Sequence, residues 1–557
     1  MEGGLSSIRI GVLLDSLSTA PAWIRRILRD ITGTPGLELV LAVGNAAFIN
    51  RPRSSFWKKV ITNLPRAGWG LYWKMDSLYR TEHDAFAEVD ISDLLATVPA
   101  FTTMPAQTRF VDRFDENSIR QLKDAHLDVL LRFGFRIIKG EIINCARFGV
   151  WSYHHGDNDF YRGGPAGFWE MYENNSVSGA LLQILNEKLD AGTVIYKSFS
   201  STNTHSLRGN RNPIYWKASA FVSRKLKDLC REGQAALMPL PPAANSNPRM
   251  FSTPGNWQAL KFCFAAGFRI LAGRFRRRHW RQQWYVALAK NNAGSMPQFT
   301  ILEPPAGRFY ADPFILSRGK SDFLFFEDFS FRTNKGVISC VEIDAAGRIG
   351  QPLKVLEEPF HLSYPFVFED SGEVYMVPET ADSNSIRLYK CERFPDTWKL
   401  ERVLIDNIRA IDPTIQRHDG KYWMFANIAE PGASANDELH LFFADSLCSN
   451  WTGHPKNPVV SDVRCARPAG TLFFEQGRLH RVSQNSSLRY GHSMTVHVIE
   501  ELSATGYREK ALRQILPDWL PGRSSCTHTL NKSDRYLVTD GSRYAPRTLL
   551  GKCFNFF

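Results

Sequence analysis

Residues 311–328 read ADPFILSRGKSDFLFFED, and this stretch recurs along the second half of the chain. It places two short, aromatic-rich runs on either side of a Gly-containing turn, which is the pattern of a β-hairpin. Similar hairpins begin at Ser363, Ile411 and Ala466, and a weaker copy begins at Ser525. The second half of the chain is therefore an array of repeated β-units.

The spacing of these copies predicts the architecture. The four clear copies each carry a proline, at 313, 365, 413 and 468, so the intervals are 52, 48 and 55 residues. Repeats of roughly 40–50 residues that contain hairpins are typical of a β-propeller. Five copies predict an all-β five-bladed β-propeller over residues 286–557. A β-sandwich is the alternative, but it would not explain a regular period.

The first 200 residues show a different pattern, in which strand and helix signals alternate. The signals are IRIGVLL (8–14), PAWIRRILRDI (21–31), LELVLAVG (37–44), ENSIRQLKDAH (116–126) and LDVLLRFGF (127–135). Such alternation predicts a parallel sheet covered by helices on both faces, an α/β Rossmann-like domain. No GxGxxG follows the first strand, so dinucleotide binding is not indicated. We therefore expect an α/β domain over 1–205, a basic helical linker over 206–285 and the propeller over 286–557.

The positive charge of the chain is concentrated in this linker. Residues 201–300 hold 16 basic and 2 acidic residues, a net charge of +14 against +12 for the whole chain. Basic and apolar residues interleave most densely over 260–284, as in an amphipathic helix. Packing of its Phe face on a neighbouring domain is the preferred interpretation, and binding to an anionic membrane surface is the alternative. Nucleic acid is not an expected partner.

Composition limits the class of protein and its compartment. Hydrophobic residues make up 43% and charged residues 22% of 557 residues, which excludes a disordered chain. No run reaches the roughly 18 apolar residues of a membrane span. The nine cysteines are scattered without a CxxC pair, so we expect neither a disulfide framework nor a metal site. A cytoplasmic protein, peripheral to the inner membrane surface if the basic helix binds lipid, is the expectation.

Residues 128–195 contain a series of spaced motifs. They are Phe133-Gly134 after a buried strand, Ser152-Tyr153-His154, Arg162-Gly163-Gly164-Pro165 and Leu189-Asp190-Ala191-Gly192. Together they resemble the formyltransferases that use 10-formyltetrahydrofolate, including the sugar N-formyltransferases. The resemblance covers about 200 residues. One position departs from the family pattern, because Ser152 stands where the family has asparagine.

The resemblance implies a division of roles among these residues. His154 and Asp190 would move protons, and Ser152 would donate to the oxyanion of the tetrahedral intermediate. The cofactor 10-formyltetrahydrofolate would be bound by the following residues: Phe133, Gly134, Phe135, Arg136, Gly163 and Gly164. His155 competes with His154 for the catalytic role. Asp157 and Asp159 are expected to shape a turn rather than to bind a metal.

The propeller has candidate residues of its own. Equivalent positions of the blades meet at one mouth of a propeller. The residues before the four prolines are Asp312, Tyr364, Asp412 and Arg467, and His528 is the candidate in the fifth copy. The pattern resembles arabinanase- and invertase-type glycosidases, with Asp312 as base and Asp412 as modulator. Arg467 stands where those enzymes carry the acid, which argues against hydrolysis because glycosidases need two carboxyl groups.

A second resemblance lies in the fourth copy, ARPAGTLFFEQGRLHRVSQNSSLRYG, which begins at Ala466. With Arg467, Gln484, Arg489 and Tyr490 it resembles the N-terminal domain of the plant glucosamine inositolphosphorylceramide transferase family. This resemblance implies a carbohydrate-handling domain in which Arg467 and Arg489 suit an anionic glycan.

The expected function combines the two halves of the chain. It is formyl transfer from 10-formyltetrahydrofolate to the amine of an amino sugar, either nucleotide-linked or a glycan precursor, with carbohydrate bound by the propeller. One alternative is a catalytically inactive, formyltransferase-like protein that binds glycans as a scaffold. The other alternative is a propeller glycosidase that acts through Asp312 and Asp412.

Overall fold

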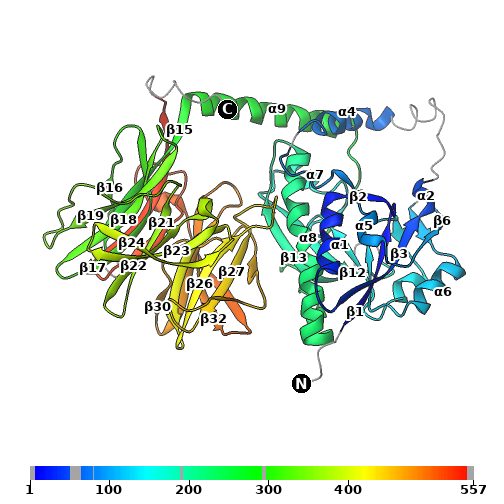
Figure 1. Ribbon diagram of the computed structural model, residues 1–557. Coiled ribbons are helices and arrows are strands. Elements are labelled where there is room, and N and C mark those ends of the chain that lie inside the picture. The colour runs from blue at the N-terminus through cyan, green and yellow to red at the C-terminus, as the bar shows by residue number, and fades with distance from the viewer. Residues whose placement is uncertain are drawn as a thin grey trace. The chain divides into compact units, whose positions relative to one another are not determined.

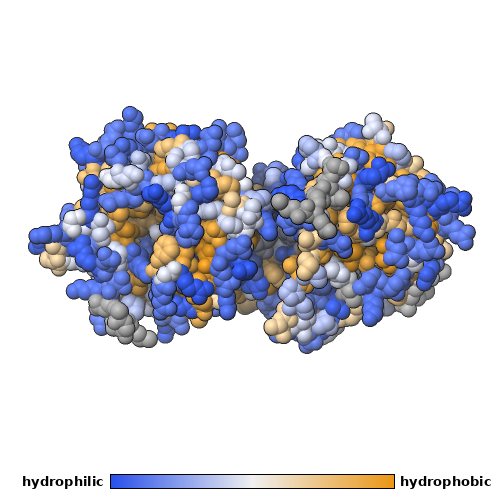
Figure 2. Space-filling view, turned by 90° about the horizontal axis from the view of Figure 1, so that it is seen from below, coloured by the Kyte–Doolittle hydropathy of each residue, from blue (hydrophilic) through white to orange (hydrophobic). Residues whose placement is uncertain are grey.

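The computed structural model describes residues 7–49, 64–79, 81–108, 110–188, 192–291 and 297–547. The chain divides into two compact units (Figure 1). Unit 1 comprises Met1–Ile270 together with Glu430–Ser434, and unit 2 comprises Leu271–Ala429 and Ala435–Phe557. In the view of Figure 2, polar residues cover much of the visible face of each unit. Smaller apolar areas show among these polar residues.

Unit 1 is built on a seven-stranded sheet. The strand order is β13-β12-β10-β8-β1-β3-β5, in which β10, β8, β1, β3 and β5 are parallel and β12 and β13 are antiparallel. The strands are β1 (Ile8–Leu14), β3 (Leu37–Asn45), β5 (Ala100–Thr103), β8 (Val129–Arg132), β10 (Val150–His154), β12 (Val177–Ile184) and β13 (Thr193–Ser201). The predicted α/β class of the first half is confirmed.

Alternation along β1 explains why helices cover both faces of this sheet. Side chains of successive strand residues point to opposite faces. Ile10 and Val12 pack in one apolar cluster with α1 (Ala22–Thr32) and α8 (Leu207–Glu232), whereas Leu13 packs in another with α6 (Glu116–Asp124). The run IRIGVLL is apolar on both sides because both sides are buried.

The segment expected as a linker over 206–285 is divided in the structure. Helix α8 lies inside unit 1, where Phe221, Leu226 and Leu229 are buried in the same core as β1. Helix α9 (Asn256–His279) follows, and the boundary between the units falls within it. None of the described helices has the length and apolarity that a bilayer crossing would need.

Shorter elements complete unit 1. Three small sheets pair β2 (Thr19–Pro21) with β4 (Glu88–Asp90), β11 (Tyr161–Gly163) with β14 (Arg249–Phe251), and β6 (Ala106–Gln107) with β7 (Val111–Arg113) and β9 (Ile137–Ile138). The short helices are α2 (Ala46–Ile49), α4 (Ala67–Asp76), α5 (Ser92–Leu95) and α7 (Phe168–Tyr172).

Unit 2 consists of five antiparallel sheets, each built around four strands. Sheet 1 contains β15 (Trp280–Lys290), β16 (Thr300–Leu302), β34 (Leu530–Lys532) and β35 (Tyr536–Pro546). Sheet 2 contains β17 (Arg308–Arg318), β18 (Ser321–Ser330), β19 (Lys335–Ile343) and β20 (Leu353–Leu356). Sheet 3 contains β21 (Ser363–Asp370), β22 (Glu373–Glu379), β23 (Ser385–Arg393) and β24 (Thr397–Asp406).

The remaining two sheets follow the same plan. Sheet 4 contains β25 (Ala410–His418), β26 (Lys421–Ile428), β27 (Glu438–Ala444), β28 (Thr452–Gly453) and the short β29 (Val460–Ser461). Sheet 5 contains β30 (Phe473–Glu475), β31 (Arg478–Asn485), β32 (Ser493–Leu502) and β33 (Tyr507–Ile515). The four clear repeats supply the first hairpins of sheets 2, 3, 4 and 5 in turn. The weak copy supplies strands of sheet 1.

Apolar clusters join each sheet of unit 2 to its neighbour in sequence. Sheets 2, 3 and 4 share one cluster, sheets 1 and 2 share a second, and sheets 4 and 5 share a third. Sheet 5 also packs on sheet 1, where Leu530 lies beside Val482 and Met494. In sheet 1 the first strand of the unit, β15, pairs with the last, β35, over eleven positions from Trp280↔Pro546 to Lys290↔Tyr536.

Candidate functional site

Three candidate residues of unit 2 are placed by one local feature that occurs in three sheets. The pairing of the first hairpin shifts register between Ala311 and Phe314 in β17, and the same shift occurs in β21 and β25. At the shift, Asp312, Tyr364 and Asp412 have φ values of 51°, 46° and 50°. Residues other than glycine rarely adopt a positive φ. Where they do, the residue is often at a functional site.

Asp312 links sheets 1, 2 and 3. Its Oδ1 accepts a hydrogen bond from Thr529 Oγ1 at 2.9 Å, and its Oδ2 accepts one from the Tyr364 backbone at 3.3 Å. His528 Nε2 lies 3.6 Å from Asp312 Oδ1, while His528 Nδ1 pairs with Asp540 Oδ2 at 2.6 Å. Among the described residues, Asp312, His528 and Asp540 are the group whose ligand atoms, all within 4.8 Å, could hold a metal ion.

Asp412 is held from two sides. Arg467 donates to it through Nε at 2.6 Å and Nη2 at 3.2 Å, and Gln484 Nε2 donates to Asp412 Oδ2 at 2.9 Å. The Arg467 guanidinium also lies 4.8 Å from the ring centre of Tyr490. The arginine in the fourth copy therefore neutralises a buried carboxylate of the third copy.

Two further carboxyl groups belong to the same site, and the sequence analysis missed them. Glu327 pairs with Ala311 and Glu379 pairs with Ser363, so both lie opposite the register shift of their hairpins. Glu379 Oε2 also accepts a 3.4 Å hydrogen bond from the Asp412 backbone. The signal was present, because Glu327, Glu379 and Asn427 repeat at the intervals of 52 and 48 residues that the prolines show.

We call this group the central cluster: Asp312, Glu327, Glu379, Asp412, Asp540, Arg467 and His528. Burial and mutual repulsion of the carboxylates set their protonation. Burial raises the pKa of Asp312 to about 6, with His528 opposing the shift and Asp412 and Asp540 adding to it. Burial and the neighbouring carboxylates raise the pKa of Glu327 and Glu379 well above the usual value. Asp540 and Asp312 raise the pKa of His528, although burial opposes them.

The central cluster contains more hydrogen-bond acceptors than donors. Five carboxyl groups, which only accept hydrogen bonds when ionised, face one guanidinium and one imidazole. In addition, the buried amide oxygens of Gln484 and Asn427 find no hydrogen-bond partner among the residues that the structure describes. Unsatisfied buried acceptors are costly, so the arrangement favours a ligand that brings positive charge and several donors.

Aromatic side chains border the cluster on its accessible side. Trp284 stacks on His528 with ring centres 4.1 Å apart, and Tyr490 meets His528 edge-on at 5.2 Å. Tyr490 is 39% exposed and the side chains of Arg467 and Glu379 are each 12% exposed, so the cluster reaches solvent at this edge. The structure thus brings together five of the six candidates of unit 2. Arg489 is exposed, and its carbonyl oxygen accepts a hydrogen bond from the His492 backbone at 3.2 Å.

The candidates of unit 1 are arranged differently from the expectation. Ser152 Oγ accepts a 2.9 Å hydrogen bond from Arg132 Nη1, and His154 Nε2 lies 2.9 Å from the Tyr161 carbonyl oxygen. His155 is half-buried and stacks on Tyr215 with ring centres 3.6 Å apart, which is a packing role. Asp190 lies outside the described residues.

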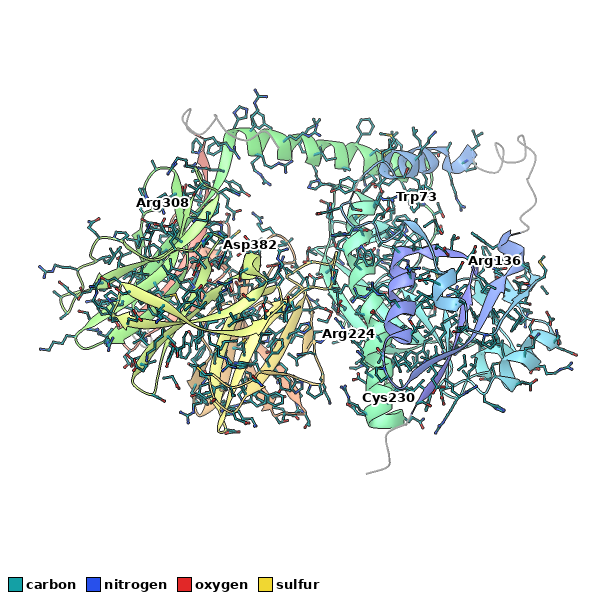
Figure 3. All side chains as sticks on the ribbon, in the orientation of Figure 1. Trp73, Arg136, Arg224, Cys230, Arg308 and Asp382 are labelled. Atoms are coloured by element: carbon teal, nitrogen blue, oxygen red, sulfur yellow. The ribbon has the colours of Figure 1, made fainter. Side chains whose placement is uncertain are left out.

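The loop expected to bind folate has its backbone groups hydrogen-bonded to side chains of the same unit. The carbonyl oxygens of Phe135 and Arg136 both accept hydrogen bonds from Arg132 Nη2. The backbone N–H of Phe135 donates to Asp15, and that of Arg136 (Figure 3) donates to Asp112. The groups that would pair with a pterin are therefore already used.

The remaining folate candidates are also constrained. A Cβ on Gly134 would meet the Asp15 backbone, and one on Gly163 would meet the Phe251 carbonyl, so both glycines allow the chain itself to pack closely. The cavity beside Ser152 and Arg132 measures about 100 Å³. Ligand pockets usually measure about 300–1,000 Å³, so this cavity is smaller than that range.

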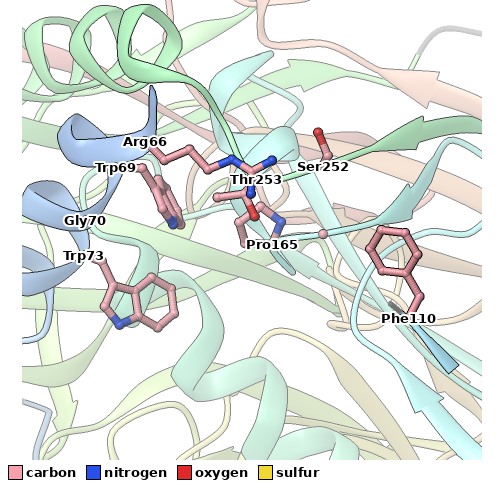
Figure 4. A pocket seen from close by; sticks show the side chains of 9 residues that line it. Arg66, Trp69, Gly70, Trp73, Phe110, Pro165, Ser252 and Thr253 are labelled. Atoms are coloured by element: carbon pink, nitrogen blue, oxygen red, sulfur yellow. The ribbon is translucent and has the colours of Figure 1, made fainter. Parts of the chain in front are cut away.

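A larger cavity of about 810 Å³ lies elsewhere in unit 1 (Figure 4). It opens at the Gly164–Pro165 turn, and its walls are formed by the following residues: Arg66, Trp69, Gly70, Trp73, Phe110, Ser252 and Thr253. Gly164 is the one folate candidate that lines it. The walls combine aromatic rings with a single guanidinium, and no carboxyl group is among them.

Comparison with known proteins places a family resemblance in unit 2. Residues 300–527 match the family described as "Glucosamine inositolphosphorylceramide transferase 1, N-terminal". The protein of that name from Arabidopsis thaliana is 36% identical over 237 residues, which cover 42% of this chain and 31% of the relative. The protein from Oryza sativa subsp. japonica is 35% identical over 41% of this chain and 32% of the relative. The chain thus spans about a third of the length of these relatives.

Solved structures give weaker likenesses. A family 117 glycoside hydrolase of Zobellia galactanivorans is 10% identical, with 47% of this chain and 90% of that chain covered and a TM-score of 0.32. Glycinamide ribonucleotide transformylase 1 of Symbiobacterium toebii is 12% identical, with 44% and 95% covered and a TM-score of 0.28. Likenesses at this level assign neither an activity nor a substrate.

The relatives correct the expected activity. They are named glucosamine inositolphosphorylceramide transferases, which are enzymes of glycan transfer. The expectation of a folate-dependent formyltransferase is therefore wrong. In addition, Arg132 donates hydrogen bonds to two carbonyl oxygens of the loop that was expected to bind folate. Residues 300–527 are therefore similar to the N-terminal domain of glucosamine inositolphosphorylceramide transferase 1.

Proposed function

We propose that unit 2 is a closed five-bladed β-propeller whose central cluster binds an amino-sugar residue of a glycan. The five sheets would be the blades. The apolar clusters between successive sheets and the pairing of β15 with β35 support closure. The hydrogen bond from the Gly470 backbone to Tyr364 Oη, at 2.7 Å, supports a common axis because it joins sheet 5 to sheet 3.

The excess of buried acceptors is the observation that carries the choice of ligand. A protonated amine brings positive charge, and sugar hydroxyl groups bring further donors, so an amino sugar supplies what the cluster lacks. Tyr490, which is 39% exposed, offers apolar ring surface at the accessible edge. The names of the relatives, which specify glucosamine and an inositol-containing sphingolipid, are consistent with such a ligand.

We propose binding rather than hydrolysis as the role of the cluster. Glycoside hydrolysis needs one free carboxylate and one carboxylic acid on either side of the scissile bond. Asp412 is bound by both Arg467 and Gln484, and Arg467 occupies the place of the acid. In a larger glycan-transfer reaction, this domain would hold the sugar.

Calorimetric titration of the full chain tests the ligand class. We expect glucosamine to bind, and N-acetylglucosamine to bind at least about tenfold more weakly because acetylation removes the charge. Glu379→Gln should weaken glucosamine binding, whereas Glu500→Gln, on the surface of β32, should leave it unchanged. Affinity should rise as the pH passes about 6, since Asp312 then ionises. Equal binding of the two sugars, or no binding of either to folded protein, would contradict the proposal.

A further inference from the structure

Helix α9 (Asn256–His279) carries a continuous apolar stripe on its exposed side. The stripe consists of large side chains spaced three or four residues apart, each between 47% and 75% exposed: Trp257, Leu260, Phe264, Phe268, Leu271 and Phe275. Residues at this spacing share one face of a helix. Figure 3 shows side chains projecting from α9.

The stripe is not the face with which the first part of α9 packs on the rest of unit 1. Ala259, Phe262 and Ala266 are buried on another side of the helix, where the Phe262 ring meets Tyr72 of α4 and Phe168 of α7 at 5.2 Å and 5.0 Å. These packing contacts with unit 1 leave the residues of the stripe exposed. An exposed run of six large apolar side chains far exceeds the scattered single residues of an ordinary surface.

The charge of α9 has one sign. Its 24 residues include no Asp or Glu. Its basic side chains are exposed around and beyond the C-terminal part of the stripe, among them Arg274, Arg277 and Arg278. An apolar face flanked by arginines, without any acidic residue, complements a surface that is apolar inside and negatively charged at its boundary.

We propose that α9 docks in the plane of an anionic membrane surface, with the stripe inserted among the lipid chains and the arginines at the headgroups. This inference is independent of the amino-sugar proposal. Helix α9 is not apolar enough to cross the bilayer, so it lies along the surface. A second copy of the chain is a poorer occupant because it would bring two rows of arginine together. Nucleic acid would leave the six apolar side chains without a partner.

Vesicle sedimentation of the full chain tests the apolar part of the proposal. We expect binding to vesicles of phosphatidylcholine with phosphatidylserine, and a loss of about tenfold or more in the triple variant Phe264→Ser, Phe268→Ser, Phe275→Ser. The matched control is Phe474→Ser with Leu512→Ser, since both residues are exposed on sheet 5. An unchanged affinity of the stripe variant, with native circular dichroism, would overturn the proposal.

The charge part has its own test. Vesicles of phosphatidylcholine alone, or high salt, should reduce binding about tenfold, because headgroup charge attracts each arginine. Arg274→Gln, Arg277→Gln, Arg278→Gln should act in the same direction, whereas Lys510→Gln with Arg513→Gln, on exposed β33, should not. Equal binding to neutral and anionic vesicles would overturn the proposal. So would loss of a dimer, rather than of vesicle binding, in the stripe variant.

Discussion

Replacing Arg467 with methionine is expected to lower the free energy of unfolding of unit 2 by about 3–5 kcal/mol. Arg467 is the guanidinium that faces the carboxylates of the central cluster, and it donates two hydrogen bonds to Asp412. Methionine fills a similar volume but leaves Asp412 as a buried charge beside Glu379 and Asp312. The cost of an unpaired buried charge, rather than lost packing, makes the effect large.

A double-mutant cycle separates these causes. Arg467→Met with Asp412→Asn removes the charge as well as its partner, so we expect the double variant to recover much of the lost stability. Arg508→Met is the control because Arg508 is 65% exposed in its pair with Glu500, and its loss should cost less than about 1 kcal/mol. Denaturant unfolding, monitored by hydrogen exchange of peptides from unit 2, measures the free energy of unfolding of each variant. A small effect of Arg467→Met would show that the cluster is more hydrated than its burial indicates.

The stability of unit 2 is expected to fall as the pH rises from about 4 to about 6. Asp312 has a pKa of about 6 in the folded protein and an ordinary value of 3.8, so the folded state binds more protons over this range. The contribution of Asp312 amounts to about 3 kcal/mol, at about 1.4 kcal/mol for each pH unit. The raised pKa values of Glu327 and Glu379 act in the same direction, and His528 loses its stabilising charge above its usual pKa.

Asp312→Asn is the informative variant for this pH dependence. Asparagine keeps the acceptor for Thr529 but does not titrate, so the profile of the variant should be flatter between about pH 4 and 6. Asp344→Asn is the control, because Asp344 is in a turn where hydrogen bonds to Arg348 lower its pKa. Global hydrogen exchange of peptides from β17 and β35 reports unit 2 separately from unit 1. A rise in stability over the same range would contradict the protonation assigned to the cluster.

Much of the architecture could be predicted from the sequence because it depends on local periodicity. The apolar run at residues 8–14 predicted a strand buried on both faces, and the 52- and 48-residue intervals predicted the repeated hairpins. The extent of unit 1 was harder to predict. Helix α8 carries many basic residues, yet Phe221 and Leu226 bury one side of it, and only tertiary packing shows this.

The central cluster could be predicted in part. Asp312, Tyr364 and Asp412 were found because each precedes a proline, which marks the position clearly. Glu327 and Glu379 were missed because they lie on the second strand of each hairpin, where no proline draws attention to them. In unit 1, the residue types matched a folate site, but the sequence could not show that Arg132 would turn inward and use the loop carbonyls.

The pairing of β15 with β35 has a mechanical consequence. Trp280 pairs with Pro546, so the first residue of β15 and the last residue of β35 lie at the same end of one antiparallel pair. A force that pulls these two residues apart acts on one pair at a time, beginning at Trp280, instead of shearing all eleven pairs together. Under modest tension at these two residues, β15 and β35 should therefore separate one residue pair after another. Sheets 2 to 5 should stay folded until the last pair, Lys290 with Tyr536, has separated.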